Sequence, residues 1–301
     1  MEKRDFLRVW DLSREETENI LGRGLELKNA EKLEKSLKDK IVALVFEKPS
    51  TRTRVSFEAA AIRLGATSLY LSSRDLQLSR GEPIKDTARV LSRYVDCVVI
   101  RTFSQHTLEE FAKFSRVPVI NGLSDMFHPC QALSDVMTVM EKGIDLKTSK
   151  VAWIGDGNNV CHSWIEVAAL LGFEFAIACP EGFEPDSQIL ETAKRKFNAN
   201  IWITHDPKEA VKGARVVNTD VWVSMGQEEE TRKRLEVFKK FQVNEELMSL
   251  AEKDAIFLHC LPAHRGEEVT EEVLEGPRSV VWDQAENKMW LHMALLEFLL
   301  G

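Results

Sequence analysis

Residues 41–65 read IVALVFEKPSTRTRVSFEAAAIRLG, and this stretch predicts the unit from which the fold is built. Its six apolar residues, Ile41 to Phe46, form a short run typical of a strand buried on both faces of a parallel sheet. The polar loop that follows opens a helix over residues 51–64, which Gly65 can end as C-cap residue. A strand, a polar loop and a helix in this order indicate parallel α/β construction.

The same alternation of short apolar runs and helical patterns continues along the whole chain. In the first half we expect further strands near residues 67–71, 97–100 and 118–120, and helices over 13–35, 84–94, 108–114 and 129–141. After a polar connector at 142–149 we expect strands at 151–154, 173–178, 200–203, 214–218, 255–259 and 280–282. The predicted fold class is α/β, with two doubly wound parallel-sheet domains, a cleft between them, and the domain boundary in the connector.

Composition restricts the class of protein. Of the 301 residues, 44% are hydrophobic and 29% are charged, a balance typical of soluble globular proteins. The net charge of −8 opposes general binding to nucleic acid, and no run approaches the ~18 consecutive apolar residues of a membrane span. Five cysteines without a C-x-x-C spacing, and a start without the apolar core of a signal peptide, favour a reducing compartment. We therefore expect a cytoplasmic protein with neither a nucleic-acid nor a membrane partner.

The loop after the first strand has the features of an anion site. Ser50 is a natural N-cap residue, and Thr51 and Thr53 add hydroxyl groups in the same turn. Arg52 and Arg54 lie where the helix dipole favours negative charge, so an anion should compensate them. Backbone N–H groups, hydroxyls and guanidinium forks together form a phosphate-sized site, although an ordinary capped helix with exposed arginines is the simpler alternative. The P-loop pattern G-x-x-x-x-G-K-[ST] is absent from the sequence, which argues against a P-loop nucleotidase.

Two further strand ends add groups suited to a carbonyl. Arg101 directly follows the strand at 97–100, and the segment H-P-C-Q at 128–131 opens a helix with proline at its first position. His128 and Gln131 are three residues apart, so they can face one ligand. An imidazole and an amide beside an arginine can polarise a carbonyl, because charge develops on its oxygen as a nucleophile adds. Alone, His128 would be interpreted as a structural histidine, but beside Arg101 we interpret it as a ligand-binding group.

The second half contains a loop, Gly155 to Val160, that superficially resembles a dinucleotide-binding loop. The pattern G-x-G-x-x-G fails at Val160, and no acidic residue closes the next strand, so an oxidoreductase is disfavoured. We interpret Asn159 as a polar group at a helix start, suited to a carboxylate. Asp220 follows the strand at 214–218, where it could hold an ammonium group or simply cap a turn.

Cys260 follows the strand at 255–259 in the segment H-C-L-P. It could be a buried thiol, a nucleophile or a contact for a substrate amine. A zinc site from His259, Cys260 and His264 is disfavoured, because adjacent residues of a strand point to opposite faces. We expect neither a metal nor a cofactor.

These segments, in this order, resemble the carbamoyltransferase family over essentially the whole chain. The resemblance is carried by S-T-R-T-R at 50–54, H-P-C-Q at 128–131 and H-C-L-P at 259–262. Asp220, the S-M-G loop at 224–226 and Cys260 are similar to the members that use ornithine, whereas members that use aspartate are expected to carry H-P-L-P and no S-M-G loop. The resemblance implies transfer of the carbamoyl group of carbamoyl phosphate to the δ-amine of L-ornithine, giving L-citrulline and phosphate in arginine metabolism.

The resemblance also implies a role for each matching residue and an assembly. The implied carbamoyl-phosphate site comprises Ser50, Thr51, Arg52, Thr53, Arg101, His128, Gln131, Cys260, Leu261 and Lys288, with Gln77 supplied by a neighbouring subunit of a homotrimer. The implied ornithine site comprises Asn159, Asp220, Ser224 and Met225, and the implied catalytic groups are Arg101, His128 and Cys260. The domains are then residues 1–142 for carbamoyl phosphate, 150–284 for ornithine, and a C-terminal helix at 285–301 that packs on the first domain.

Two positions depart from the family pattern. Lys288 stands where the family usually has an arginine after A-E-N, and lysine keeps the charge but loses the bidentate fork. Ser79 stands where glycine is common. The alternatives are a carbamoyltransferase for another amine, such as putrescine or an N-acylated ornithine, an NAD(P)-dependent oxidoreductase, and a non-catalytic amino-acid sensor.

Overall fold

The structure is a computed structural model that describes residues 3–72, 74, 76–77, 81–223 and 231–301. The chain divides into two compact units, one of residues 1–137 and 286–301 and the other of residues 138–285. The C-terminal segment therefore packs with the N-terminal part of the chain. No helix in these described ranges is long and apolar enough to cross a membrane.

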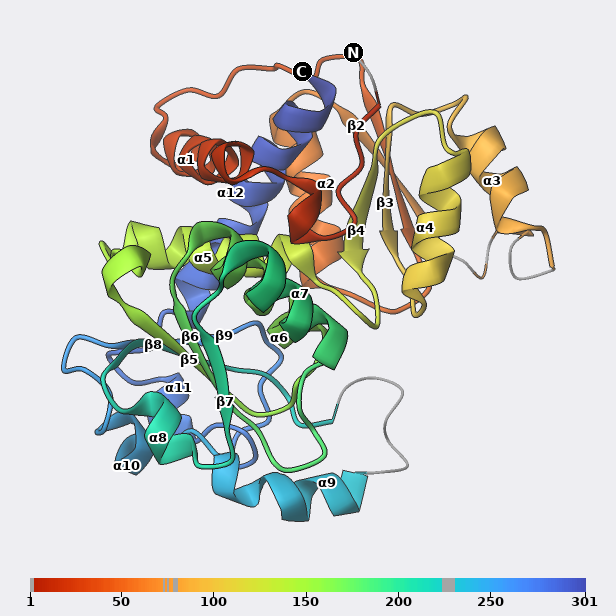
Figure 1. Ribbon diagram of the computed structural model, residues 1–301. Helices are drawn as coiled ribbons and strands as arrows, with labels where there is room; N and C mark the ends of the chain where they lie inside the picture. Colours follow the sequence, from red (N-terminus) through yellow and green to blue (C-terminus); the bar gives the residue numbers. More distant parts are fainter. Residues whose placement is uncertain (1–2, 73, 75, 78–80, 224–230) are drawn as a thin grey trace. The chain divides into compact units, whose positions relative to one another are not determined.

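The first unit is a four-stranded parallel sheet with helices on both faces (Figure 1). The strand order is β2-β1-β3-β4, so the chain starts inside the sheet, moves to one edge and returns to build the other. Helix α2 and residues 286–300 of α12 (Val281–Leu300) cover one face, and α3 and α4 cover the other (Figure 1). The elements are η1 (Val9–Asp11), α1 (Arg14–Asn29), β1 (Ile41–Phe46), α2 (Arg52–Arg63), β2 (Thr67–Ser72), α3 (Ile84–Leu91), β3 (Cys97–Arg101), α4 (Gln105–Phe114), β4 (Val119–Leu123) and α5 (Pro129–Glu141).

The second unit is a five-stranded parallel sheet in the order β7-β6-β5-β8-β9, again with helices on both faces (Figure 1). Its main core packs α8, α10 and α11 against one face of this sheet. The elements are η4 (Leu146–Thr148), β5 (Lys150–Ile154), α6 (Asn159–Leu171), β6 (Glu174–Ala178), α7 (Ser187–Phe197), β7 (Ile201–Thr204), α8 (Pro207–Val211), β8 (Ala214–Thr219), α9 (Thr231–Phe238), η6 (Lys239–Phe241), α10 (Glu245–Met248), β9 (Ile256–His259), α11 (Glu271–Leu274) and α12 (Val281–Leu300).

Two doubly wound parallel sheets confirm the predicted fold class, and their central strands are buried apolar runs as expected for sheets covered on both faces. The strand predicted at 280–282 is wrong. Val281 begins α12, and only Ser279 forms an isolated bridge, with Phe257. A short apolar run cannot be distinguished from the first turn of a buried helix by its pattern alone, which explains the error. The first helix is also shorter than predicted, because the backbone becomes extended at Ala30.

Candidate active site

In an open α/β sheet, ligands bind at the carboxyl ends of the two neighbouring strands from which the chain departs in opposite directions. In the first unit these strands are β1 and β3, and in the second they are β5 and β8. The predicted residues at their carboxyl ends are 50–53 and Arg101 in the first unit, and Asn159 and Asp220 in the second. Topology therefore singles out the same two places as the polar motifs.

The turn after β1 presents the predicted phosphate-binding groups. The N-cap of α2 is Thr51, so the prediction of Ser50 at this position is wrong by one residue. The Ser50 hydroxyl nevertheless accepts a hydrogen bond from the backbone N–H of Thr53 (3.2 Å). The guanidinium of Arg54 pairs with Glu58 (3.2 Å) and lies over a tyrosine ring, so its charge is compensated. Arg52 makes no ion pair with any residue that the structure describes. Arg52 is therefore the cation of this turn that remains for an anionic ligand.

Lys288 of α12 joins three predicted ligand groups within the first unit. Its ammonium donates hydrogen bonds to Gln131 Oε1 (2.8 Å), Thr53 Oγ1 (3.2 Å) and His128 Nε2 (3.4 Å). All four side chains are buried. The starts of α2 and α5 and the middle of α12, which are far apart in the sequence, therefore meet at one cation.

His128 is neutral in this arrangement. Burial, together with the charges of Lys288 and Arg101, holds the pKa of His128 well below its usual value. An ammonium group has only donors, so Nε2 of His128 accepts in the contact with Lys288. Arg101, the last residue of β3, is buried as well. The site thus offers a neutral imidazole beside two cations, a combination suited to an oxygen on which negative charge develops.

Lys48 is a further cation of this site that no sequence motif singles out. Its side chain is only 8% exposed, and its ammonium lies 4.1 Å from the ring centroid of Phe103. Burial and the neighbouring Arg101 lower the pKa of Lys48. The carboxylates of Glu47 and Asp125, whose charges act on Lys48, accept hydrogen bonds from the loop after β3 and from the first residue of α4. The burial of Lys48 depends on contacts with residues far from it in the sequence, so its neighbours in the sequence do not predict that it is buried.

In the second unit Asp220 is held by three donors. Its Oδ2 accepts from Asn158 Nδ2 (2.8 Å), and its Oδ1 accepts from the Val221 N–H (2.8 Å) and the Cys260 thiol (3.1 Å). Asn158 is also the N-cap of α6, since its Oδ1 accepts from two backbone N–H groups. Asp220 and Cys260, predicted from separate strand ends, are therefore in direct contact. The bridging residue is Asn158, whereas sequence reasoning singled out its neighbour Asn159, the first residue of the helix.

A buried hydrogen bond between His259 and Glu268 holds the H-C-L-P segment in place. His259 Nε2 lies 2.9 Å from Glu268 Oε1, and both side chains are 0% exposed. His259 Nδ1 accepts from the Leu261 N–H (2.9 Å), so the proton of the ring is on Nε2, which donates to Glu268. Leu261 has a φ of 59°, an unfavourable conformation for a residue other than glycine. Atoms of Asp220, His259 and Cys260 come within 4.8 Å of one another, but both ring nitrogens of His259 are already engaged.

A buried ion pair links the loop after β5 to α9. Arg234 Nη1 donates to Asp156 Oδ2 (3.0 Å) and to the Trp222 carbonyl (2.9 Å). Burial, opposed by the charge of Arg234, raises the pKa of Asp156 to about 6. No sequence motif identifies this pair, because its two members lie 78 residues apart.

Four predicted residues remain, namely Gln77, Asn159, Ser224 and Met225. Gln77 is exposed after β2, and its backbone carbonyl accepts a hydrogen bond from the Glu82 N–H (3.2 Å). The hydroxyl of Ser163 donates to the carbonyl of Asn159 (3.0 Å). Ser224 and Met225, with Ser79 and the S-M-G loop as a whole, lie outside the described residues.

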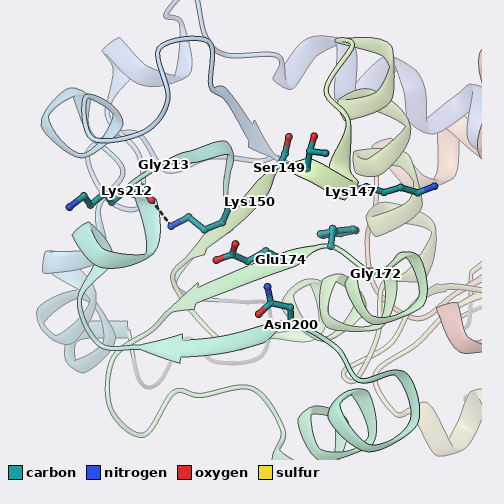
Figure 2. A pocket seen from close by; sticks show the side chains of 10 residues that line it. Lys147, Ser149, Lys150, Gly172, Glu174, Asn200, Lys212 and Gly213 are labelled. Carbon is teal, nitrogen blue, oxygen red and sulfur yellow. Dashed lines mark hydrogen bonds between the residues drawn. The ribbon is translucent and has the colours of Figure 1, made fainter.

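A pocket of about 470 Å³ lies in the second unit (Figure 2). It is at the amino ends of the strands, whereas Asp220 follows the carboxyl end of β8. Its lining residues precede β5, β6, β7 and β8 and include Lys147, Lys150 and Lys212. Lys147 and Lys212 extend in opposite directions, and the ammonium of Lys150 donates to the carbonyl of Lys212 (Figure 2). The lysines therefore do not converge on an anion, and this pocket is not part of the predicted site.

Comparison with known proteins agrees with these motifs. Residues 4–141 match the family model "Aspartate/ornithine carbamoyltransferase, carbamoyl-P binding domain", and residues 147–299 match "Aspartate/ornithine carbamoyltransferase, Asp/Orn binding domain". The chain is 55% identical over 294 residues to an ornithine carbamoyltransferase of Desulfotalea psychrophila, covering 97% of both chains. The solved ornithine carbamoyltransferase of Pyrococcus furiosus superposes with a TM-score of 0.95 at 49% identity, covering 99% of this chain and 97% of that one. The anabolic enzyme of Campylobacter jejuni superposes with a TM-score of 0.94 at 46% identity, covering 98% of both.

Proposed function

The chain belongs to the aspartate/ornithine carbamoyltransferase family. We propose which of its residues bind each substrate and which promote carbamoyl transfer. It is a carbamoyltransferase that converts carbamoyl phosphate and L-ornithine to L-citrulline and phosphate, in arginine biosynthesis. The observation that carries the proposal is the meeting of Thr53, His128 and Gln131 at Lys288.

Carbamoyl phosphate binds to the first unit, in the domain bounded by residue 142 and completed by the C-terminal helix. Ser50, Thr51, Arg52 and Thr53 hold the phosphate at the start of α2, because backbone N–H groups and an unpaired guanidinium favour an anion there. Arg101, His128 and Gln131 hold the carbamoyl end, with Lys288 beside them. Cys260 and Leu261 add contacts from the second domain.

Ornithine binds to the second domain, residues 150–284. Asp220 pairs with the α-ammonium group of ornithine, and Asn159, Ser224 and Met225 complete the contacts. The support is the buried carboxylate of Asp220, which already has the Cys260 thiol as a neighbour (3.1 Å). Cys260 positions the attacking amine and forms no covalent intermediate.

The reaction requires the δ-amine in its uncharged form, although the pKa of such an amine in water is about 10.4. Burial and nearby cations shift that equilibrium toward the uncharged amine. The amine nitrogen attacks the carbamoyl carbon, and Arg101, His128 and the Thr53 hydroxyl stabilise the oxyanion. The carbon–oxygen bond to phosphate then breaks, and the departing phosphate takes the amine proton. The residues need neither a metal nor a cofactor for these steps.

The active form is a homotrimer in which Gln77 completes the site of the neighbouring subunit. The first unit offers an apolar surface on the outer face of α2 and the edge strand β2, where Val55, Ile62 and Leu69 are 54%, 60% and 42% exposed. Exposed apolar groups gathered in this way are typical of a subunit interface. Ile62→Asp should therefore give monomers in light scattering, whereas a trimeric Ile62→Asp would contradict this interface.

The protein works in the cytoplasm. All five cysteines are free thiols, four of them buried, as expected for a reducing compartment. Burial raises the pKa of Cys97 well above its usual value and that of Cys130 to about 12, so these thiols remain protonated and unreactive.

The deciding experiment measures citrulline formation from carbamoyl phosphate with L-ornithine, beside L-aspartate, putrescine and N-acetyl-L-ornithine. Turnover confined to L-ornithine is the expected result. Turnover with a different amine would leave the carbamoyl-phosphate half intact and overturn the role of Asp220. Thermal stabilisation by carbamoyl phosphate but not by NAD separates a carbamoyltransferase from an oxidoreductase by mass action.

A further inference from the structure

His292 lies on α12 in the core of the first unit, one helical turn after Lys288. Its side chain is 0% exposed, and its ring stacks on Phe57 with the centroids 3.5 Å apart. Neither ring nitrogen has a hydrogen-bond partner among the residues that the structure describes. A neutral imidazole has one donor and one acceptor, and leaving both unpaired in a core is unfavourable. The two unpaired ring nitrogens therefore point to a hydrogen-bond partner in another state of the site.

The contacts of Lys288 show what that state is. An ammonium has three N–H donors, and Thr53, Gln131 and His128 each accept one. The bond to His128 Nε2 is the longest of the three, at 3.4 Å. While Nε2 accepts from Lys288, it cannot donate to a carbamoyl oxygen. The role proposed above for His128 therefore requires Lys288 to give up this bond when substrate binds.

His292 offers an acceptor one turn along the same helix as Lys288. Residues four apart on a helix share a face, and side chains tilt toward the N-terminus, so the ring of His292 leans over the turn that carries Lys288. Burial, and then the charge of Lys288, lowers the pKa of His292 well below its usual value. The ring is therefore neutral and keeps a lone pair to offer.

We propose that His292 is a positioning residue of the carbamoyl-phosphate site, which accepts the Lys288 N–H that His128 releases when the carbamoyl group binds. This inference rests on the proposed function and deepens it. Lys288 alternates between the two rings while its bonds to Thr53 and Gln131 persist. Once exchange with water has moved the ring proton of His128 from Nδ1 to Nε2, Nε2 donates to the carbamoyl oxygen. A compact ammonium on a flexible stem can make this exchange, whereas a rigid guanidinium fork is less suited to it. The exchange accounts for lysine at a position where the family usually has arginine.

The first test is His292→Phe, which keeps a ring against Phe57 and removes both unpaired polar atoms. We expect the melting temperature to stay level or rise, because no hydrogen bond is lost in the empty site. The KM for carbamoyl phosphate should rise by roughly tenfold, because the bound state loses a charged hydrogen bond. If His292 only packed in the core, His292→Phe would not raise both the melting temperature and the KM. An unchanged KM would overturn the proposal.

The second test is a double-mutant cycle with Lys288→Met. Replacing His292 in the Lys288→Met background should leave the KM for carbamoyl phosphate unchanged, because the donor is already absent. A rise of the same size in both backgrounds would show that His292 acts without Lys288 and would overturn the proposal. His292→Gln restores an acceptor and should recover part of the affinity. Met293→Leu, at a fully buried neighbour on α12, is the control for repacking and should leave KM as it is.

Failure of this inference and failure of the proposed function give different results. Citrulline formation by the unmodified chain tests the function alone. The effect of His292→Phe can also be read as a loss of the thermal stabilisation that carbamoyl phosphate provides, without turnover. If the unmodified chain binds carbamoyl phosphate and His292→Phe binds it equally well, only the inference fails.

Discussion

Lys48 carries a buried positive charge whose one described contact is with the ring of Phe103. Lys48→Met keeps the length of the side chain and removes the charge. We predict that the KM for carbamoyl phosphate rises by roughly tenfold, the value of one charge-assisted contact, while the KM for ornithine stays constant. Steady-state kinetics with each substrate varied in turn measures both quantities.

The matched control for Lys48 is Lys113, which lies over the ring of Phe114 (5.8 Å) and is exposed on α4. Lys113→Met removes a lysine–aromatic contact of the same kind outside the site. It should leave both KM values unchanged. Equal effects of the two substitutions would mean that the contact, and not its position beside Arg101, is what matters.

Asp220 tests the ornithine half of the site. Asp220→Asn keeps an acceptor for Asn158 or Cys260 but removes the negative charge. We predict a rise of the KM for ornithine by tenfold or more, since a hydrogen bond between charged groups contributes about 1.5 to 3 kcal/mol. The KM for carbamoyl phosphate should change little. Asp186→Asn, at the N-cap of α7, is the control, and a similar loss there would point to a fold defect.

Single residues show where sequence reasoning reaches its limit. The motif residues of the first unit lie together because each follows a strand or opens a helix, positions that the sequence pattern predicts. Lys48 and His292 were not predicted, because what distinguishes them is burial against residues that are distant in the sequence. The sequence analysis singles out Asn159 and not Asn158, since only the backbone shows which of two adjacent asparagines is the N-cap.

The loop from β5 to α6 leaves no room for a side chain at Gly157. A Cβ there would lie 2.3 Å from Pro185 N and 2.5 Å from Glu184 C, both backbone atoms. Gly157→Ala must therefore displace one of these segments, and we predict a loss of about 1 to 3 kcal/mol in the free energy of unfolding. Gly22→Ala is the control, because α1 has open space there and alanine should stabilise the helix by roughly 0.5 to 1 kcal/mol. Chemical denaturation that ranked the two variants the other way would refute this account.

The pair of Asp156 and Arg234 connects the loop after β5 with α9 and has a pH signature. The pKa of Asp156 in the folded chain, about 6, lies above that of an unfolded carboxyl group. Between roughly pH 4 and 6 the folded state therefore still holds a proton on Asp156 that the unfolded chain, whose carboxyl pKa is about 3.9, has already released. The contribution of this group to the free energy of unfolding is present below this window and decreases as the pH rises through it.

Asp156→Asn should remove this dependence. Relative to the unmodified chain, its free energy of unfolding should change less steeply with pH, by at most about 3 kcal/mol over that window. Urea denaturation at a series of pH values measures the difference. Asp254→Asn removes an exposed partner of Arg215 and should leave the slope unaltered. Parallel curves for Asp156→Asn and the unmodified chain would disprove the assignment.

At the scale of the whole molecule, the repeated strand–loop–helix pattern predicts two parallel sheets because each repeat buries its apolar strand between helices. The pattern carries less information about edges. Leu69 on strand β2 is 42% exposed and Ile62 on α2 is 60% exposed. Their spacing in the sequence is that of a core face, although these side chains are not in a core. Only the three-dimensional arrangement distinguishes such a surface from a core face, and the homotrimer remains a prediction that rests on it and on the resemblance.

A shared active site makes a prediction that a self-contained one does not. Arg52→Ala and Gln77→Ala each inactivate every site of a pure trimer if Gln77 acts in the neighbouring subunit. In randomly mixed trimers, each mixed ring contains one junction at which an intact Arg52 meets an intact Gln77, so roughly a quarter of all sites should recover. The measurement is citrulline formation after the two inactive variants are unfolded, mixed and refolded together. Arg52→Ala mixed with Arg101→Ala is the control, because both defects lie in the same subunit and no junction is repaired. Recovery in neither mixture, or equally in both, would show that Gln77 does not complete the neighbouring site.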